Sequence, residues 1–247
     1  MGMTLVEKII SEHAGKNVHA GELVISKVDV AAVQDGTGPL TVQEFKKLGK
    51  EKVNIISCHI GSGASICAID SGKVVDTSMG FSPMTGIMMG TRPGDVDPSI
   101  VTYVAEEEGT SVEEVMIMLN KHSGSEGICG KSDSRDIEDG IKAGDELCIL
   151  AQEMYARRIA NYVAMYNNEL NGADVIVLTA GIGENSKDTR KDIIEHIASL
   201  GVKLDEEKNN FRGEFRLIST EDSKIPVYVI PTNEELMIAL DTYELIK

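Results

Sequence analysis

The stretch Val175-Ile176-Val177-Leu178-Thr179-Ala180-Gly181-Ile182-Gly183-Glu184-Asn185 is the strongest indication of the fold. Its first four residues are apolar and predict a buried strand, which two glycines separate from a helix that starts at Asn185. This arrangement is common in nucleotide-binding sites, because glycine lets the backbone approach a ligand closely and adopt a positive φ. Many strand-to-helix turns that bind no ligand also carry two glycines, so a plain turn is the alternative.

A second glycine turn lies in the segment Cys58-His59-Ile60-Gly61-Ser62-Gly63-Ala64-Ser65. We predict a strand over 53–59, the turn at 61–63, a strand over 64–69, and a third strand over 73–76 after a turn at 71–72. A loop of this kind can point backbone N–H groups at a phosphate. The alternative is a hairpin turn beside a hydrogen-bonded histidine.

Composition and charge narrow the class of protein. The chain has 247 residues, 42% of them hydrophobic, and a net charge of −16, so a sizeable core is possible and nucleic-acid binding is not expected. Its four cysteines include no CxxC pair, which predicts neither a zinc nor a cluster site and suits a reducing compartment. With neither an apolar signal core nor a membrane-length apolar run, we expect a cytoplasmic protein without membrane contact.

The remaining pattern predicts an α/β domain. We expect helices over 97–108, 111–121 and 145–170, a strand over 174–179, a strand over 225–230 and a last helix over 233–245. The longest helix carries an apolar stripe that we assign to the core; it consists of Leu147, Leu150, Ala151, Met154, Ile159, Tyr162, Val163, Tyr166 and Leu170. Residues 1–50 read as a short α/β fragment, with helices over 4–13 and 41–48 and a strand over 23–30.

Three further positions carry groups suited to phosphate chemistry. The planar fork of Arg92 suits a phosphoryl group in transit, although an ion pair with Asp95 or Asp97 is the plainer reading. The run Asp133-Ser134-Arg135 either contacts a ligand or simply caps the helix that follows it. Glu234 either helps to bind Mg²⁺ or sits in the first turn of a helix because the helix dipole favours it there.

Together, the segments 58–65, 78–92, 179–185 and 231–235 resemble, in this order, the C-terminal part of acetate kinase from about residue 54 to residue 247. The resemblance implies the actin, Hsp70 and sugar-kinase fold (ribonuclease H-like), with ATP and Mg²⁺ as cofactors, acetate or acetyl phosphate as substrate, and a homodimer. It makes Arg92 and His59 catalytic and Glu234 the metal-associated residue. It assigns nucleotide contacts to His59, Ile60, Gly61, Ser62, Gly63, Asp133, Ser134, Arg135, Gly181, Ile182, Gly183, Glu184 and Asn185.

The sequence departs from that family's pattern at two of these positions. Ser62 stands where the family has Asn, and its hydroxyl has a shorter reach. Ser134 stands where the family usually has Phe, which removes an aromatic face that could pack on adenine. In the family, the N-terminal domain supplies another phosphate loop, a second substrate arginine, another histidine and a catalytic aspartate, and none of those segments occurs in this sequence.

Residues 1–50 resemble instead the start of the large subunit of 3-isopropylmalate dehydratase and its aconitase relatives. The resemblance rests on residues 1–4, 7–9, 13–16, 21–22 and 35–39, and that family's cluster cysteines have no counterpart. We therefore predict two parts, 1–50 and 51–247, joined near residues 50–53. Natural fusion, an error of gene assembly and deliberate engineering are alternatives that the sequence leaves open.

The reaction that this resemblance implies is reversible transfer of a phosphoryl group between ATP and acetate, and the chain is expected to hold an incomplete site for it. Three alternatives remain at this point. They are a catalytically inactive nucleotide-binding or dimerisation module, a fragment of a dehydratase-like hydro-lyase, and a related kinase for propionate or butyrate.

Overall fold

The computed structural model describes residues 11, 15–19, 52–233 and 242. Contacts divide the chain into two compact units, Met1–Gln34 and Asp35–Lys247, and the fold below belongs to the second. The elements predicted over 4–13, 23–30, 41–48 and 233–245 lie wholly or mostly outside the described residues, as does Glu234.

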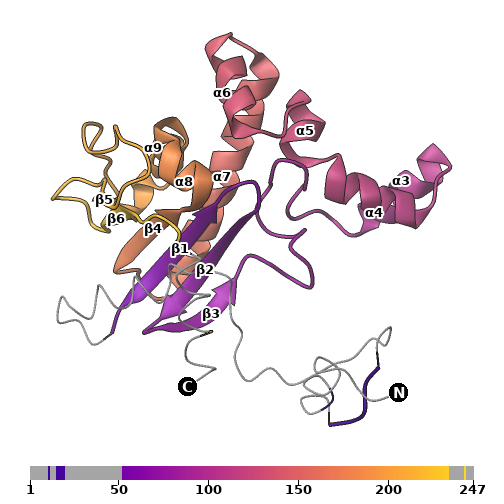
Figure 1. Ribbon diagram of the computed structural model, residues 1–247, viewed down its shortest axis with the longest axis horizontal. Coiled ribbons are helices and arrows are strands. Elements are labelled where there is room, and N and C mark those ends of the chain that lie inside the picture. Colours follow the sequence, from indigo (N-terminus) through magenta and orange to yellow (C-terminus); the bar gives the residue numbers. More distant parts are fainter. Residues whose placement is uncertain (1–10, 12–14, 20–51, 234–241, 243–247) are drawn as a thin grey trace. The chain divides into compact units, whose positions relative to one another are not determined.

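A mixed sheet organises the described part of the second unit (Figure 1). Its strand order is β3-β2-β1-β4-β6-β5. The central strands β1, β4 and β6 run parallel, and antiparallel neighbours β2, β3 and β5 extend the sheet at both sides. The bounds are β1 (Asn54–Ile60), β2 (Ala64–Asp70), β3 (Lys73–Thr77), β4 (Val175–Thr179), β5 (Arg216–Leu217) and β6 (Val227–Val229). The meander predicted over 53–76 and the strand before the glycines are confirmed.

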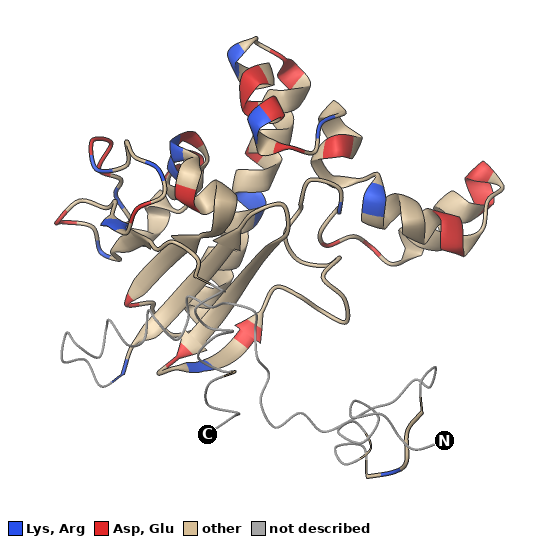
Figure 2. Ribbon diagram, viewed as in Figure 1, with Lys and Arg blue, Asp and Glu red and all other residues tan. Residues whose placement is uncertain are grey.

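The central strands are apolar on both faces. All five residues of β4 are buried, and β1 and β2 are buried along nearly their whole length. Continuous apolar strands of this kind are typical of parallel sheets whose two faces are both covered. Charged residues therefore lie mainly on helices, on loops and at strand ends, as Figure 2 shows.

Helices follow or connect these strands. Their bounds are α3 (Ser99–Glu108), α4 (Val112–Lys121), α5 (Gly124–Cys129), α6 (Ser134–Lys142), α7 (Glu146–Glu169), α8 (Ala180–Asn185) and α9 (Lys187–His196), followed by the 3-10 turn η1 (Ala198–Leu200). The capping box predicted at Ser111 and Glu114 is confirmed, because each side chain bonds the backbone N–H of the other. Helix α5 is not predicted from the sequence, because it is short and contains two glycines.

The long helix α7 packs against β1 and β2 and also contacts α5, α6 and α9. The predicted stripe is correct in its second half, where Ile159, Val163 and Tyr166 are buried. In the first turns it is wrong for Leu147, Leu150 and Met154, which are 53%, 46% and 43% exposed, and right for Ala151, which is buried. Cys148 and Tyr155, which the predicted stripe leaves out, also face the interior. Cys148, Ala151 and Tyr155 keep helical spacing with Ile159. The small side chains of Cys148 and Ala151 let α6 approach α7.

The glycine segment differs from its prediction in a specific way. Residues 180–185 form the short helix α8, and the next helix begins at Lys187 after a cap by Ser186, instead of at Asn185. The residue with positive φ is Ala180, at 66°, and neither Gly181 nor Gly183 has one. Gly183 serves close packing, since an added Cβ would lie 3.4 Å from the backbone carbon of Leu178.

Tyr166 provides a test of core energetics. Its side chain is fully buried, and its hydroxyl has no hydrogen-bond partner among the described residues. We expect Tyr166→Phe to raise the free energy of unfolding by about 1 kcal/mol, because the change removes a buried group whose hydrogen bond is not made.

The matched control for that substitution is Tyr162→Phe. The Tyr162 hydroxyl donates to Asp95 Oδ2 at 2.6 Å, and the two tyrosine rings meet edge to face. Here we expect a loss of stability, since the carboxylate loses a partner. Urea denaturation followed by circular dichroism measures both, and equal shifts of the same sign would contradict this reading.

Candidate functional site

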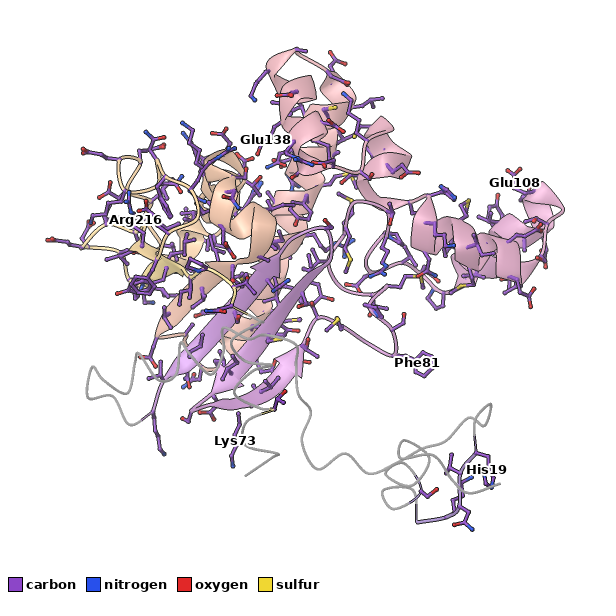
Figure 3. All side chains as sticks on the ribbon, viewed as in Figure 1. His19, Lys73, Phe81, Glu108, Glu138 and Arg216 are labelled. Atoms are coloured by element: carbon purple, nitrogen blue, oxygen red, sulfur yellow. The ribbon has the colours of Figure 1, made fainter. Side chains whose placement is uncertain are left out.

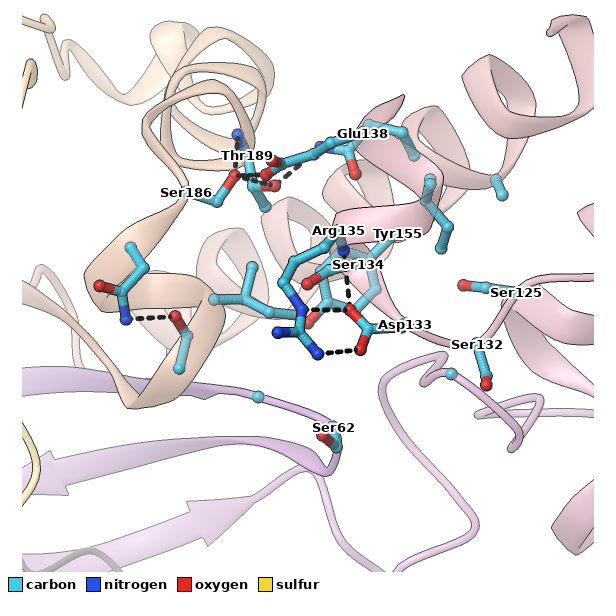
Figure 4. Close-up of a pocket in the computed structure, with 18 of the residues that line it drawn as sticks. Ser62, Ser125, Ser132, Asp133, Ser134, Arg135, Glu138, Tyr155, Ser186 and Thr189 are labelled. Carbon is cyan, nitrogen blue, oxygen red and sulfur yellow. Dashed lines mark hydrogen bonds and ion pairs between the residues drawn. The ribbon is translucent and has the colours of Figure 1, made fainter. Parts of the chain in front are cut away.

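A pocket of about 570 Å³ opens where the carboxyl end of β1 meets α6, α7, α8 and α9 (Figure 4). Its size is in the range of small-molecule sites. Its walls come from seven separate parts of the chain. They are Gly61 and Ser62; Gly90 and Thr91; Ser125; Ser132, Asp133, Ser134, Arg135, Ile137 and Glu138; Ala151, Gln152 and Tyr155; Gly181, Ile182, Asn185, Ser186 and Thr189; and Arg212.

The first turn of α6 brings an ion pair to the pocket. Arg135 donates from Nε to Asp133 Oδ1 at 3.0 Å and from Nη2 to Oδ2 at 2.6 Å. Asp133 also caps α6 by accepting from the backbone N–H of Arg135 at 2.9 Å. These hydrogen bonds from Arg135 lower the pKa of Asp133 to about 2, so the carboxylate is ionised at neutral pH. Asp133 therefore caps α6 and lines the pocket at the same time, so its role as a cap does not exclude contact with a ligand.

On the other side, α8 presents backbone to the pocket. An added Cβ on Gly181 would meet no atom within 4 Å, so the space above this residue is open. Ile182 adds an apolar surface, and Asn185 is held by a hydrogen bond from its Nδ2 to the Gly181 carbonyl oxygen at 2.9 Å. Arg212 reaches the same region and donates to the Asn185 carbonyl oxygen at 3.1 Å.

A network of hydrogen-bonded polar side chains forms the pocket wall between α6, α7 and α9. Ser186 donates to Glu138 Oε1 at 2.5 Å and lies 2.9 Å from Thr189 Oγ1, and Gln152 donates to Thr189 Oγ1 at 3.1 Å. Gln152 also donates to Asp192 at 2.8 Å, and burial raises the pKa of that carboxyl. In Figure 4 the side chains of Ser186, Thr189 and Glu138 lie across the pocket from Ser62.

Buried Arg190 holds α8 in place from behind. Its guanidinium donates to the carbonyl oxygens of Gly183 and Glu184 at 3.1 and 3.0 Å, and to Asn209 Oδ1 at 2.7 Å. It also bonds the carbonyl oxygens of Asn209 and Phe211 and stacks on the Phe211 ring. Burial lowers the pKa of Arg190 to about 10, which leaves it charged at neutral pH.

Glu184 has a supporting position as well. Its Oε1 accepts from the backbone N–H and from the hydroxyl of Thr232, at 2.8 and 2.9 Å. The Thr232 hydroxyl in turn accepts from the backbone N–H of Ala180 at 3.1 Å, which ties the strained residue to the segment after β6. Thr232 thus ties both Ala180 at the start of α8 and Glu184 near its end to the segment after β6.

The structure brings together most, but not all, of the residues predicted for nucleotide contact. Those that line the pocket are Gly61, Ser62, Asp133, Ser134, Arg135, Gly181, Ile182 and Asn185. Those that lie outside its lining are His59, Ile60, Gly63, Gly183 and Glu184, of which Ile60 is fully buried in the core. Glu234 lies outside the described residues, and its predicted role stays a prediction.

Arg92 and His59 flank the pocket without lining it. Gly90 and Thr91 form part of the wall, and Arg92 follows them with its Nη1 3.8 Å from Met89 Sδ. The predicted alternative for Arg92 was an ion pair with Asp95 or Asp97, but within residues 52–233 Asp95 instead contacts Arg158 at 3.5 Å. His59 is half-buried near the end of β1, level with Ser65 and Thr179 of the adjacent strands.

Sequence reasoning missed Glu138 on α6 and the walls contributed by α7 and α9. Glu138, Gln152 and Thr189 are ordinary helix-surface residues in the sequence, and nothing in their spacing indicates a site. Only the spacing of Ser186 and Thr189, which is that of a helix cap, carried a signal, and it indicates a helix start.

Two kinds of site are not found in the described part of the chain. No group of three or more His, Cys, Asp or Glu side chains there is arranged to hold a metal ion. None of the helices described is both long enough and apolar enough to span a membrane.

Comparison with known proteins places most of the chain in one family. Residues 40–240 match the acetokinase family. Acetate kinase from Thermosipho melanesiensis is 53% identical over 207 residues, which is 83% of this chain and 51% of that protein. Acetate kinase from Clostridioides difficile is 50% identical over 203 residues, or 81% of this chain and 51% of the relative.

Solved structures agree with this placement. The crystal structure of Porphyromonas gingivalis acetate kinase has a TM-score of 0.80 and 43% identity, covering 84% of this chain and 53% of that one. That of a propionate kinase from Francisella tularensis has a TM-score of 0.77 and 44% identity, covering 83% and 52%. The actin, Hsp70 and sugar-kinase fold expected for this part of the chain is therefore confirmed.

The chain spans about half the length of the curated relatives it matches. The expected resemblance of residues 1–50 to the dehydratase large subunit is not borne out, because the acetokinase match already begins at residue 40, inside that segment. The division into 1–50 and 51–247 stays a prediction.

Proposed function

The chain belongs to the acetokinase family, and on that premise we propose that it forms the nucleotide-binding part of an acetate kinase-type phosphotransferase. The reaction is transfer of the γ-phosphoryl group of ATP to acetate, which gives ADP and acetyl phosphate. The observation that carries the proposal is the pocket between α6 and α8, where a ligand-sized space adjoins an open glycine and two arginines.

The lining suits a nucleotide in chemical terms. Ile137, Ile182 and the ring of Tyr155 offer apolar surface for a base, and Ser62, Ser134 and Asn185 offer hydrogen-bonding groups. Arg135 and Arg212 supply positive charge in a chain whose net charge is −16, so an anionic ligand finds its attraction locally.

Phosphoryl transfer depends chiefly on alignment and on positive charge around the transferred group. We assign that charge to Arg92 by family resemblance; Arg92 directly follows Gly90 and Thr91 in the pocket wall, and no ion pair with Asp95 or Asp97 is present in the described region. His59 stands two residues before Gly61 and can donate a hydrogen bond to a phosphoryl oxygen.

Mg²⁺ fits this scheme as a partner of the phosphates. It commonly binds through one or two carboxylates together with phosphate oxygens and water, so it needs no dedicated cluster of side chains. We assign Glu234 to that role by family resemblance, and we expect the protein to act in the cytoplasm.

A homodimer is part of the proposal. Helix α3 buries none of its residues, and Ile100, Tyr103 and Ile117 on α3 and α4 are 38%, 59% and 52% exposed. Phe81, on the loop before α3, is fully exposed and projects from the ribbon in Figure 3. Exposed apolar groups of this kind are typical of a surface that contacts another protein.

Two alternatives have an observation in their favour. The similarity to the structure of a propionate kinase keeps a longer acid open as substrate. The second alternative is a nucleotide-binding module without turnover, and it concerns these 247 residues by themselves, which span about half of the relatives' length. Rates measured with acetate, propionate and butyrate show which acid is the substrate. The rate of acetyl phosphate formation distinguishes a kinase from a module without turnover.

Restoring the family's aromatic residue tests the nucleotide assignment. Ser134 lines the pocket at the start of α6. We expect Ser134→Phe to tighten binding of Mg-ATP about fivefold to tenfold in calorimetry, because stacking of a base on an aromatic ring contributes about 1–3 kcal/mol. The control is Ser223→Phe, a change remote from the lining, which should have no effect. Absence of nucleotide binding by both the unchanged chain and Ser134→Phe would reject the proposed function.

A further inference from the structure

Behind one wall of the pocket lies a cluster of four reactive or charged side chains. Lys131 Nζ is 3.2 Å from Cys148 Sγ and 3.3 Å from Asp145 Oδ2. The Cys129 thiol is within hydrogen-bonding reach of Cys148 and lies 3.7 Å from the Lys131 carbonyl oxygen. Neither the family assignment nor the proposed reaction uses these groups.

The two thiols differ in access and in environment. Cys129 ends α5 and is partly exposed, whereas Cys148, in the first turn of α7, is fully buried. Burial raises the pKa of the Cys148 thiol, and the hydrogen bond from the Lys131 ammonium acts in the opposite direction. A small oxidant can therefore reach the partly exposed Cys129 first, while the buried Cys148 sulfur reacts in the second step.

Both cysteines stand one helical turn from the pocket. The Cys129 thiol donates to the carbonyl oxygen of Ser125, a pocket residue, at 3.2 Å, and Cys148 precedes the pocket residue Ala151 by three positions. A Cβ added to Gly140 would lie 2.4 Å from Cys148 Sγ, so α6 rests directly on this sulfur. Movement of Cys148 is thus felt by the helix that carries Asp133 and Arg135.

We infer that Cys129 and Cys148 form a redox-active pair that peroxide converts to a disulfide, which loosens α6 and weakens ligand binding in the adjacent pocket. The effect on ligand binding rests on the proposed function, whereas the thiol chemistry does not.

The chemistry balances with hydrogen peroxide as the oxidant. The Cys129 thiolate attacks one peroxide oxygen, the O–O bond breaks, and with one proton taken up the products are a sulfenic acid and water. Cys148 sulfur then attacks the Cys129 sulfur, the S–O bond breaks, and the hydroxyl leaves as a second water with the Cys148 proton. Two electrons pass from the two thiols to the peroxide.

Closing the bond changes the packing of α6. A disulfide requires an S–S separation of about 2.05 Å, so Cys148 must turn toward Cys129 and away from its contacts with Lys131 and Gly140. Lys131 then loses one hydrogen-bond acceptor, and α6 loses the surface on which Gly140 rests.

The first experiment identifies the bond. The full chain is treated with graded hydrogen peroxide, and peptides are mapped by mass spectrometry with and without dithiothreitol. We expect a reducible link between the peptides of Cys129 and Cys148 with loss of two hydrogen atoms, absent in Cys129→Ser and Cys148→Ala and retained in Cys67→Ser. Oxidation that stops at sulfinic acid on Cys129, a link through Cys58 or Cys67, or a link between chains would overturn the inference.

The second experiment measures the consequence. We expect oxidation to speed amide hydrogen exchange over residues 134–138 and to weaken Mg-ATP binding about tenfold, or about 1.4 kcal/mol. Dithiothreitol should reverse both effects, and Cys148→Ala should show neither. Unchanged exchange over 134–138 in the linked chain would refute the coupling to α6. Absence of ATP binding in the reduced chain would count against the proposed function alone, because the link and the exchange rates are measured without ligand.

Discussion

The 247-residue chain on its own is expected to form acetyl phosphate many powers of ten more slowly than a complete acetate kinase. Arg92 and His59 can surround a transferring phosphoryl group with positive charge and hydrogen bonds, but they do not hold the attacking carboxylate in line. Such alignment can account for about 7–11 kcal/mol of barrier reduction, and the resemblance assigns it to groups of the family's N-terminal domain. Trapping acetyl phosphate as its hydroxamate measures the rate.

Mixing the chain with a separately produced N-terminal half of a relative should restore part of the activity. Arg92→Ala should then abolish the restored activity, because the proposed function assigns to Arg92 the positive charge beside the transferred phosphoryl group. The matched control is Arg157→Ala, since Arg157 is exposed and contacts only Glu153 among the described ion pairs. Rapid formation of acetyl phosphate by the purified chain alone would show that the site is complete without the other half.

Replacing Arg190 is expected to cause the largest loss of stability among single substitutions of polar residues in this fold. In Arg190→Met the carbonyl oxygens of Gly183 and Phe211 and the side-chain oxygen of Asn209 lose the donor that Arg190 supplies, whereas the carbonyl oxygens of Glu184 and Asn209 keep backbone donors. Each stranded buried acceptor costs roughly 1–3 kcal/mol, so we expect the free energy of unfolding to fall by about 3–5 kcal/mol. Arg190→Lys should recover little of this lost stability, because an ammonium group cannot reproduce the planar fork of a guanidinium.

The control for Arg190 is a second arginine against the same ring. Arg216 also stacks over Phe211, at 4.5 Å, but its side chain is 38% exposed and pairs with Glu214 at the surface. Arg216→Met should cost less than about 1 kcal/mol, as exposed ion pairs contribute little. Equal losses for both variants in chemical denaturation would mean that contact with Phe211, and not the carbonyl network, is what stabilises α8.

Five of the six described strands, all but the two-residue β5, could be predicted from the sequence because their signals are local. The mostly apolar run at 53–60 and the continuous apolar run at 175–178 indicate buried strands, and the turns at 61–63 and 71–72 carry glycine. The same local reading failed for α7, where Leu147, Leu150 and Met154 suggested the wrong inward face. A leucine pattern cannot show that the close approach of α6 at Gly140 favours the small side chain of Cys148 on the inner face.

Only part of the candidate site could be predicted from the sequence, for a related reason. Residues contributed by turns and helix starts, such as Gly61, Asp133 and Gly181, have sequence signatures. Those contributed by the sides of α7 and α9, such as Gln152 and Thr189, become neighbours only when the helices pack. The backbone conformation of Ala180 could not be predicted either, because its positive φ is held by a hydrogen bond to Thr232, 52 residues away.

The central claim is that the pocket beside α8 binds the nucleotide, and calorimetric titration of Mg-ATP into three forms of the chain tests it most directly. The unchanged chain should bind, more weakly than a complete relative. Gly181→Val should show no heat of binding, because its side chain enters the open pocket, while circular dichroism shows it folded. The control is Gly127→Val on α5, where an added Cβ would meet only the His122 carbonyl oxygen at 3.4 Å. Binding in the unchanged chain and in Gly127→Val, with none in Gly181→Val, is the predicted result. Equal binding by all three forms would contradict the claim and place the nucleotide elsewhere.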